Sequence, residues 1–67
     1  MKVKQGNHFT MTILNKPYYA VITHINKGLY IVDFYYQSEF ETSKAVGKQF
    51  FKDNKEIIEW SGRDGDD

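Results

Sequence analysis

The side chains that could do catalytic chemistry are few, and they are scattered along the chain. His8 and His24 belong to different segments, and the sequence has no cysteine to act as a nucleophile or a soft metal ligand. His24 with Asp33 is the one pairing that suggests acid–base chemistry, but such a pair more often means two half-exposed polar residues on a sheet. Glu56 and Glu59 stand three positions apart in an expected strand, so their carboxylates face opposite ways.

The sequence also lacks the usual patterns of phosphate and metal sites. It has no glycine-rich phosphate loop, and no group of residues has the spacing of metal ligands. We therefore expect a protein that is not an enzyme, with no catalytic residues, no metal and no cofactor.

Length and composition indicate one small domain. A chain of 67 residues buries only about 60% of its unfolded surface, which leaves little stability to spare. Five tyrosines, five phenylalanines and one tryptophan compensate, because large aromatic side chains fill a core efficiently. A homodimer would be a second route to the same end. We expect residues 1–62 to form the domain and residues 63–67 to form a disordered acidic tail.

Charge and hydropathy favour a cytoplasmic protein. Nine basic and nine acidic residues cancel, which removes the simplest argument for nucleic-acid binding. The opening residues, MKVKQGN, lack the apolar run of a signal peptide, and no stretch approaches the ~20 apolar residues of a membrane span. We expect no membrane partner.

Alternation of apolar and polar residues predicts three consecutive strands, at residues 8–14, 18–25 and 29–36. In the first, Phe9, Met11 and Ile13 point one way and the intervening polar residues point the other way. The second and third strands form a hairpin that holds all five tyrosines of the chain. This hairpin is the element around which we expect the rest to be organised.

The register of the hairpin has two solutions. A three-residue loop of Asn26, Lys27 and Gly28 pairs Ile25 with Leu29, and we favour it. One face of the hairpin then carries Tyr18, Ala20, Ile22, His24, Tyr30, Val32, Phe34 and Tyr36. A loop of only two residues flips the first of the two strands, because a slip of one residue exchanges its faces. That register brings Tyr19, Val21, Thr23 and Ile25 to the same face instead.

A helix is expected after the hairpin. Ser38 and Glu41 have the spacing of a capping box, which predicts a helix that begins at Glu39. An apolar stripe at helical spacing and a lysine-rich opposite side support it. The stripe is Phe40, Thr42 or Ser43, Val46 and Phe50, and the lysines are Lys44, Lys48 and Lys52.

A last strand closes the expected fold. Asp53-Asn54-Lys55 ends the helix, and residues 56–61 alternate with Ile58 and Trp60 directed inward. The fold class is therefore α+β, a small antiparallel sheet with the element order β-β-β-α-β and one helix packed on one face.

One helix covers one face of a sheet, so the other face is left open. The residues expected on that open face are Tyr19, Val21, Leu29, Ile31, Asp33 and Tyr35. Protein interfaces are enriched in aromatic residues and depleted of charge at their centre, so this set predicts a protein-binding site. An exposed strand edge is a second route to a protein partner. The alternative is ordinary exposed apolar surface, which every protein has.

Single-stranded nucleic acid is the alternative partner, because bases stack on exposed tyrosines and lysines contact phosphates. Against it, the helix lysines are expected to point away from the sheet, and Arg63 is the only arginine. Asp33 and the acidic tail would repel phosphate.

The segment from Phe40 to Trp60, FETSKAVGKQFFKDNKEIIEW, resembles small single-domain ββαβ polypeptides of phages and other mobile elements. Dmd-type antitoxins and several small anti-CRISPR proteins are examples. The shared features are a short helix with a lysine-rich outer face, a polar turn at residues 53–55 and a short closing strand. The resemblance implies a non-enzymatic inhibitor that binds a host defence or toxin protein directly. No site residue of those families matches position by position.

Overall fold

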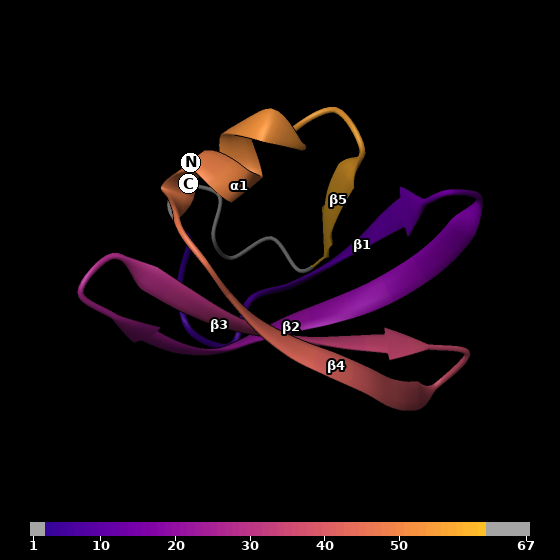
Figure 1. Cartoon of the computed structure of the whole chain (residues 1–67), viewed down its shortest axis with the longest axis horizontal. Coiled ribbons are helices and arrows are strands. Elements are labelled where there is room, and N and C mark those ends of the chain that lie inside the picture. The colour runs from indigo at the N-terminus through magenta and orange to yellow at the C-terminus, as the bar shows by residue number, and fades with distance from the viewer. Residues whose placement is uncertain (1–2, 62–67) are drawn as a thin grey trace.

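The computed structural model describes residues 3–61 as one antiparallel sheet with one short helix. In chain order the elements are β1 (His8–Ile13), β2 (Lys16–Asn26), β3 (Leu29–Tyr36), β4 (Glu39–Val46), α1 (Lys48–Asp53) and β5 (Ile58–Ser61). The five strands lie in the order β4-β3-β2-β1-β5. Figure 1 shows α1 over one face of the twisted sheet, with β5 rising beside it. The tail expected at residues 63–67 lies outside the described residues.

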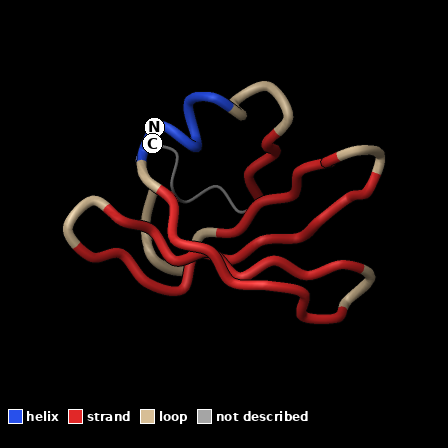
Figure 2. The backbone as a smooth tube through the Cα atoms, viewed as in Figure 1, coloured by secondary structure: helices blue, strands red, loops and turns tan. Residues whose placement is uncertain are grey.

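Three two-residue turns connect the first four strands (Figure 2). Both residues of each turn have positive φ: Leu14 and Asn15, Lys27 and Gly28, Gln37 and Ser38. Positive φ at both central positions is the type I′ geometry, whose twist matches that of the flanking strands. Only one of these six residues is a glycine, so the other five hold a backbone conformation that L-residues disfavour.

The central hairpin combines features of both expected registers. Asn26 pairs with Leu29, so the loop has two residues and the expected three-residue loop is wrong. A bulge at Thr23 then shifts the register between Ile22 and His24. Because of the bulge, all the hairpin residues that the favoured register put on the face of Tyr18 and Ala20 lie on that face, except His24. His24 points to the opposite face, and Ile25 takes the place that was expected for it.

The expected helix over residues 39–52 is wrong, because its first half is a strand. Gln37 and Ser38 form a hairpin turn, so Ser38 does not cap a helix. Residues 39–46 pair with β3 from Tyr30 to Tyr36, with a shift of register between Phe34 and Tyr35, and extend the sheet. Pairing with an existing strand satisfies backbone groups and overrides the local helical pattern.

The helix itself is a single short segment. It begins at Lys48, after Gly47 in an extended conformation, and has six residues. The Asn54 side chain ends it by donating from Nδ2 to the Phe50 carbonyl at 2.8 Å. A small antiparallel sheet with one helix is therefore confirmed, whereas the element order is β-β-β-β-α-β rather than the expected β-β-β-α-β.

The core lies between the sheet and α1. Its buried residues are Phe9, Met11, Ala20, Ile22, Tyr30, Val32, Phe34 and Ile58. We call the sheet face that carries them the inner face. Phe9 is fully buried, and the Phe51 ring of α1 and the Trp60 ring of β5 pack against it at centroid distances of 6.1 and 4.9 Å. Ile58 and Trp60 point inward as expected, while Phe50 is only half-buried.

Candidate binding face

The opposite side of the sheet, which we call the outer face, is set by alternation along the strands. In β3 the buried residues Tyr30, Val32 and Phe34 alternate with Ile31, Asp33 and Tyr35. Cross-strand pairing extends this face from β3 in both directions. To one side Tyr19 and Val21 of β2 pair with Tyr35 and Asp33, and to the other Phe40, Ser43 and Ala45 of β4 pair with Tyr35, Asp33 and Ile31.

A continuous line of rings crosses the outer face, and we call it the aromatic row. It consists of His8 in β1, Tyr19 in β2, Tyr35 in β3 and Phe40 in β4. Successive ring centroids are 5.6, 6.1 and 5.8 Å apart. These spacings and the tilted or edge-to-face angles are those of favourable aromatic pairs. The row is therefore an ordered surface that four strands hold in place.

Much of the outer face is open to solvent. Phe40 is 57% exposed, Leu29 49% and Tyr19 42%, while Val21, Ile31 and Tyr35 are half-buried. No element of the described chain covers these side chains, because α1 packs on the inner face. Several large apolar side chains that are exposed next to one another are typical of an interaction surface.

The paired strand residues of the outer face give it a negative charge. The paired strand residues directed to it within residues 3–61 include two carboxylates, Asp33 and Glu59, and neither lysine nor arginine. Asp33 accepts a hydrogen bond from Ser43 Oγ at 2.7 Å, which holds its carboxylate toward β4. The paired strand residues of this face within residues 3–61 offer apolar contact and hydrogen-bond acceptors, and they offer no ammonium or guanidinium group to a phosphate.

All six residues expected on the open face lie on the outer face. Tyr19, Val21, Ile31, Asp33 and Tyr35 occupy its middle, and Leu29 lies at the end of β3 next to the turn. Sequence reasoning missed Phe40, because that residue was assigned to a helix. The polar–apolar–polar run Glu39-Phe40-Glu41 at the start of β4 is compatible with a strand, but three residues are too few to decide against the helical spacing.

The residues considered for catalysis do not form a site. His24 and Asp33 share the outer face, but they stand in different cross-strand rows, opposite Ile31 and Val21. Asp33 is bonded to Ser43 rather than to a histidine. Among residues 3–61 no group of three His, Cys, Asp or Glu side chains could hold a metal ion.

The two edges of the sheet differ in length. Within the described chain β4 and β5 are the edge strands, with eight and four residues. The free side of β4 presents unpaired backbone groups along eight residues, which is enough to pair with an added strand. The aromatic row ends on this strand, at Phe40.

Comparisons with protein-family models, with curated proteins and with solved structures found no match to this chain. The single helix within residues 3–61 is much too short to cross a membrane.

Proposed function

We propose that this chain is a non-catalytic module that binds a protein partner through the outer face of its sheet. The observation that carries the proposal is the aromatic row, which runs from His8 to Phe40 and ends in an exposed ring. Rigid aromatic side chains supply large contact area at a low entropic cost, and such residues dominate the energetics of protein interfaces.

Two further features favour a protein over another ligand. The face carries exposed apolar groups around the Asp33 carboxylate, and apolar side chains around a few polar groups are typical of protein interfaces. The free edge of β4 adds a place where the backbone of a partner can pair. The two features adjoin at Phe40, so one partner can use both.

The class of partner comes from the resemblance of residues 40–60 to phage inhibitors. It makes a host defence or toxin protein the partner to test first, with inhibition by direct binding as the mode of action. The module would then act in the cytoplasm.

Single-stranded nucleic acid is the second candidate, and the aromatic row favours it because bases stack on exposed rings. The charge of the outer face opposes it. A backbone that runs along the row would bring phosphates near Asp33 and Glu59, and the paired strand residues of this face within residues 3–61 include no lysine or arginine to offset them. We therefore rank this function below protein binding.

The test is affinity capture from host lysate with matched variants of the full chain. Phe40→Glu places a charge at the exposed end of the aromatic row, and Ile57→Glu makes the same change at an exposed apolar residue, 43% exposed, that belongs to no strand. We expect one stoichiometric protein with the wild type and with Ile57→Glu, resistant to nuclease and moderate salt, and at least a tenfold loss with Phe40→Glu, about 1.4 kcal/mol.

Three other results would contradict the proposal in different ways. Nucleic acid, or proteins that disappear with nuclease, would favour the second candidate. Equal capture by Phe40→Glu would remove the outer face from the interaction. Capture of the bait alone would leave self-association as the remaining function. If the wild type then had twice the monomer mass in solution and Phe40→Glu had the monomer mass, the outer face would be the interface of a homodimer.

A further inference from the structure

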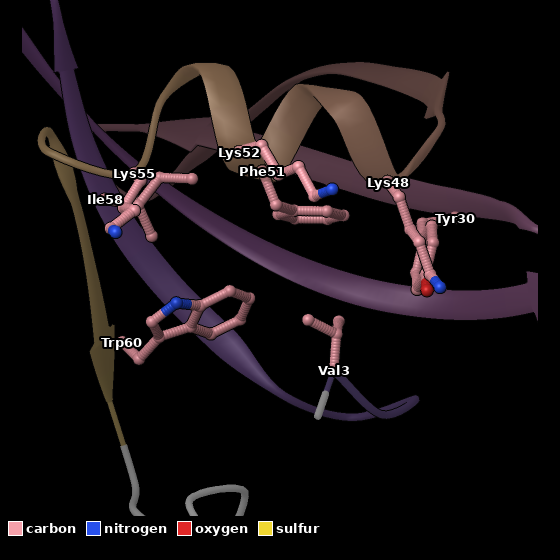
Figure 3. A pocket seen from close by; sticks show the side chains of 8 residues that line it. All are labelled: Val3, Tyr30, Lys48, Phe51, Lys52, Lys55, Ile58 and Trp60. Carbon is pink, nitrogen blue, oxygen red and sulfur yellow. The ribbon is translucent and has the colours of Figure 1, made fainter. Parts of the chain in front are cut away.

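A second surface lies on the other side of the molecule, between α1 and β5. It is a hollow of about 740 Å³, within the usual size range of small-molecule pockets. Its lining residues are Val3, Tyr30, Lys48, Phe51, Lys52, Lys55, Ile58 and Trp60. Figure 3 shows these side chains around one space, with Trp60 facing Phe51 and with Lys48 beside Tyr30.

Aromatic rings form the wall of the hollow. Phe51 lies 5.8 Å from Trp60, with an angle of 35° between the ring planes, and 5.1 Å from Tyr30 in an edge-on arrangement. Phe51 and Trp60 are both half-buried, so part of each ring stays accessible. Val3 closes one side, and a hydrogen bond from the Lys4 amide to Asn7 Oδ1 at 2.8 Å orders its segment. A planar apolar group has ring faces to pack against here.

Positive charge surrounds this wall. Lys48 and Lys52 are four residues apart in α1, on the same side of the helix, and Lys55 follows in the next turn. All three lysines are exposed. Among the described residues that line the hollow none is acidic. The nearby Asp53 carboxylate accepts a hydrogen bond from Gln49 Nε2 at 2.8 Å. In a chain of zero net charge, this is a local concentration of cations.

We propose that the hollow binds a small aromatic anion, with nucleoside monophosphates as the first compounds to test. The planar ring packs against Phe51 and Trp60, and the anionic group meets the ammonium groups of Lys48, Lys52 and Lys55. Lysine binds phosphate as a mobile point charge, so three of them can follow an anion at a half-open rim. The proposal stands independently of the outer face, which lies across the sheet.

The chain carries its own probe for this test. Trp60 is the only tryptophan, so the intrinsic fluorescence of the full-length protein reports occupancy of the hollow. We would titrate with adenosine monophosphate, with adenosine as the ring without the charge, and with inorganic phosphate as the charge without the ring. Anilinonaphthalene sulfonate serves as an aromatic anion without a nucleoside.

We expect the monophosphate to change Trp60 fluorescence with saturation, and adenosine and phosphate each to bind at least tenfold more weakly. Lys52→Gln should weaken binding several-fold, because it removes one of the three cations. Lys44→Gln is the matched control, since it removes the same charge from β4 and does not line the hollow. Both lysines are exposed, so neither change should disturb the fold.

Defined results would overturn the proposal. Equal weakening by Lys44→Gln would reduce the effect to overall charge, and equal binding of adenosine would exclude a role for the lysines. If neither aromatic anion changed the Trp60 fluorescence with saturation up to ~10 mM, the hollow would not be a binding site for aromatic anions, because any dissociation constant would exceed that concentration. Saturation with the sulfonate alone would keep the aromatic-anion site and exclude nucleotides as its ligands.

Discussion

Phe34 and Tyr35 are neighbours in β3, yet they belong to opposite faces with different surroundings. Phe34 is 5% exposed and packs edge-on against Phe9 at 6.5 Å, within a core that α1 and β5 close. The rings beside Tyr35 are those of Tyr19 and Phe40, which belong to the aromatic row, and no other element of the described chain packs over this face. The aromatic residues of this small protein therefore have two roles. Those on the inner face fill the core, and those on the outer face form an exposed surface.

The charges divide in the same way as the rings. The lysines of α1 and of the turn after it gather on the inner side, around the hollow. The outer face has Asp33 and Glu59 and neither lysine nor arginine among its paired strand positions within residues 3–61. A ligand that is anionic suits the first surface, and a protein with an apolar patch suits the second. The predictions that follow test this division.

Phe9→Ala should have the largest effect on stability. Phe9 is fully buried and its ring meets Phe34, Phe51 and Trp60, so truncation should lower the free energy of unfolding by about 3–5 kcal/mol. That is most of the stability of a domain this small. Urea denaturation followed by circular dichroism measures it. Phe40→Ala is the matched control on the outer face and should cost about 1 kcal/mol.

Substitution of the neighbouring residues Phe34 and Tyr35 sharpens the comparison. Phe34→Ala should cost about 3 kcal/mol or more by opening a cavity in the core. Tyr35→Ala removes two cross-strand ring contacts and should cost about 1–2 kcal/mol. It should also weaken capture of the partner by about 1–2 kcal/mol. If Tyr35→Ala unfolds the domain, the outer face is part of the core and the division is wrong.

The turn between β3 and β4 allows a change that leaves both faces intact. Gln37 and Ser38 have φ values of 51° and 69°, which asparagine and glycine adopt far more readily. The double substitution Gln37→Asn with Ser38→Gly should raise the free energy of unfolding by about 1 kcal/mol. Thermal denaturation measures the gain, and unchanged capture of the partner is the control. A loss of stability would show that this turn is not the type I′ connection described above.

Ser43→Ala should have the smallest effect. It removes the exposed hydrogen bond to Asp33 Oδ1 and should lower the free energy of unfolding by about 0.5 kcal/mol. Freed from Ser43, the Asp33 carboxylate remains on the outer face, so capture of the partner should change less than with Tyr35→Ala. A larger loss of capture with Ser43→Ala would move the centre of the binding surface from the rings to this polar pair.

Alternation along the strands was the most informative signal in the sequence. It gave β3 its observed bounds, placed Phe9, Ala20, Val32 and Ile58 in the core, and put the six candidate residues on one face. Within each strand these inferences need only its two-residue period. That Tyr19 and Val21 share a face with Ile31 and Tyr35 depends in addition on the register of the hairpin, and it holds because the bulge at Thr23 offsets the shorter loop.

Two features could not be predicted because distant contacts decide them. The bulge at Thr23 has no glycine or proline to mark it, and it keeps the inner face continuous across a two-residue loop. The segment 39–46 satisfies a helical spacing, and it is a strand because β3 offers an edge to pair with. Because this segment was expected to be a helix, Phe40 was not assigned to the outer face.

The hollow between α1 and β5 could not be predicted either, because its lining residues lie far apart in the sequence.

The claim that the outer face binds the partner is tested most directly by solution NMR of the isotope-labelled chain with the captured protein. The backbone amides and rings of Tyr19, Tyr35 and Phe40 should shift or broaden on binding, while Lys52 and Trp60 stay near their free positions. Changes confined to α1 and β5 would place the partner on the opposite side of the sheet and contradict the account.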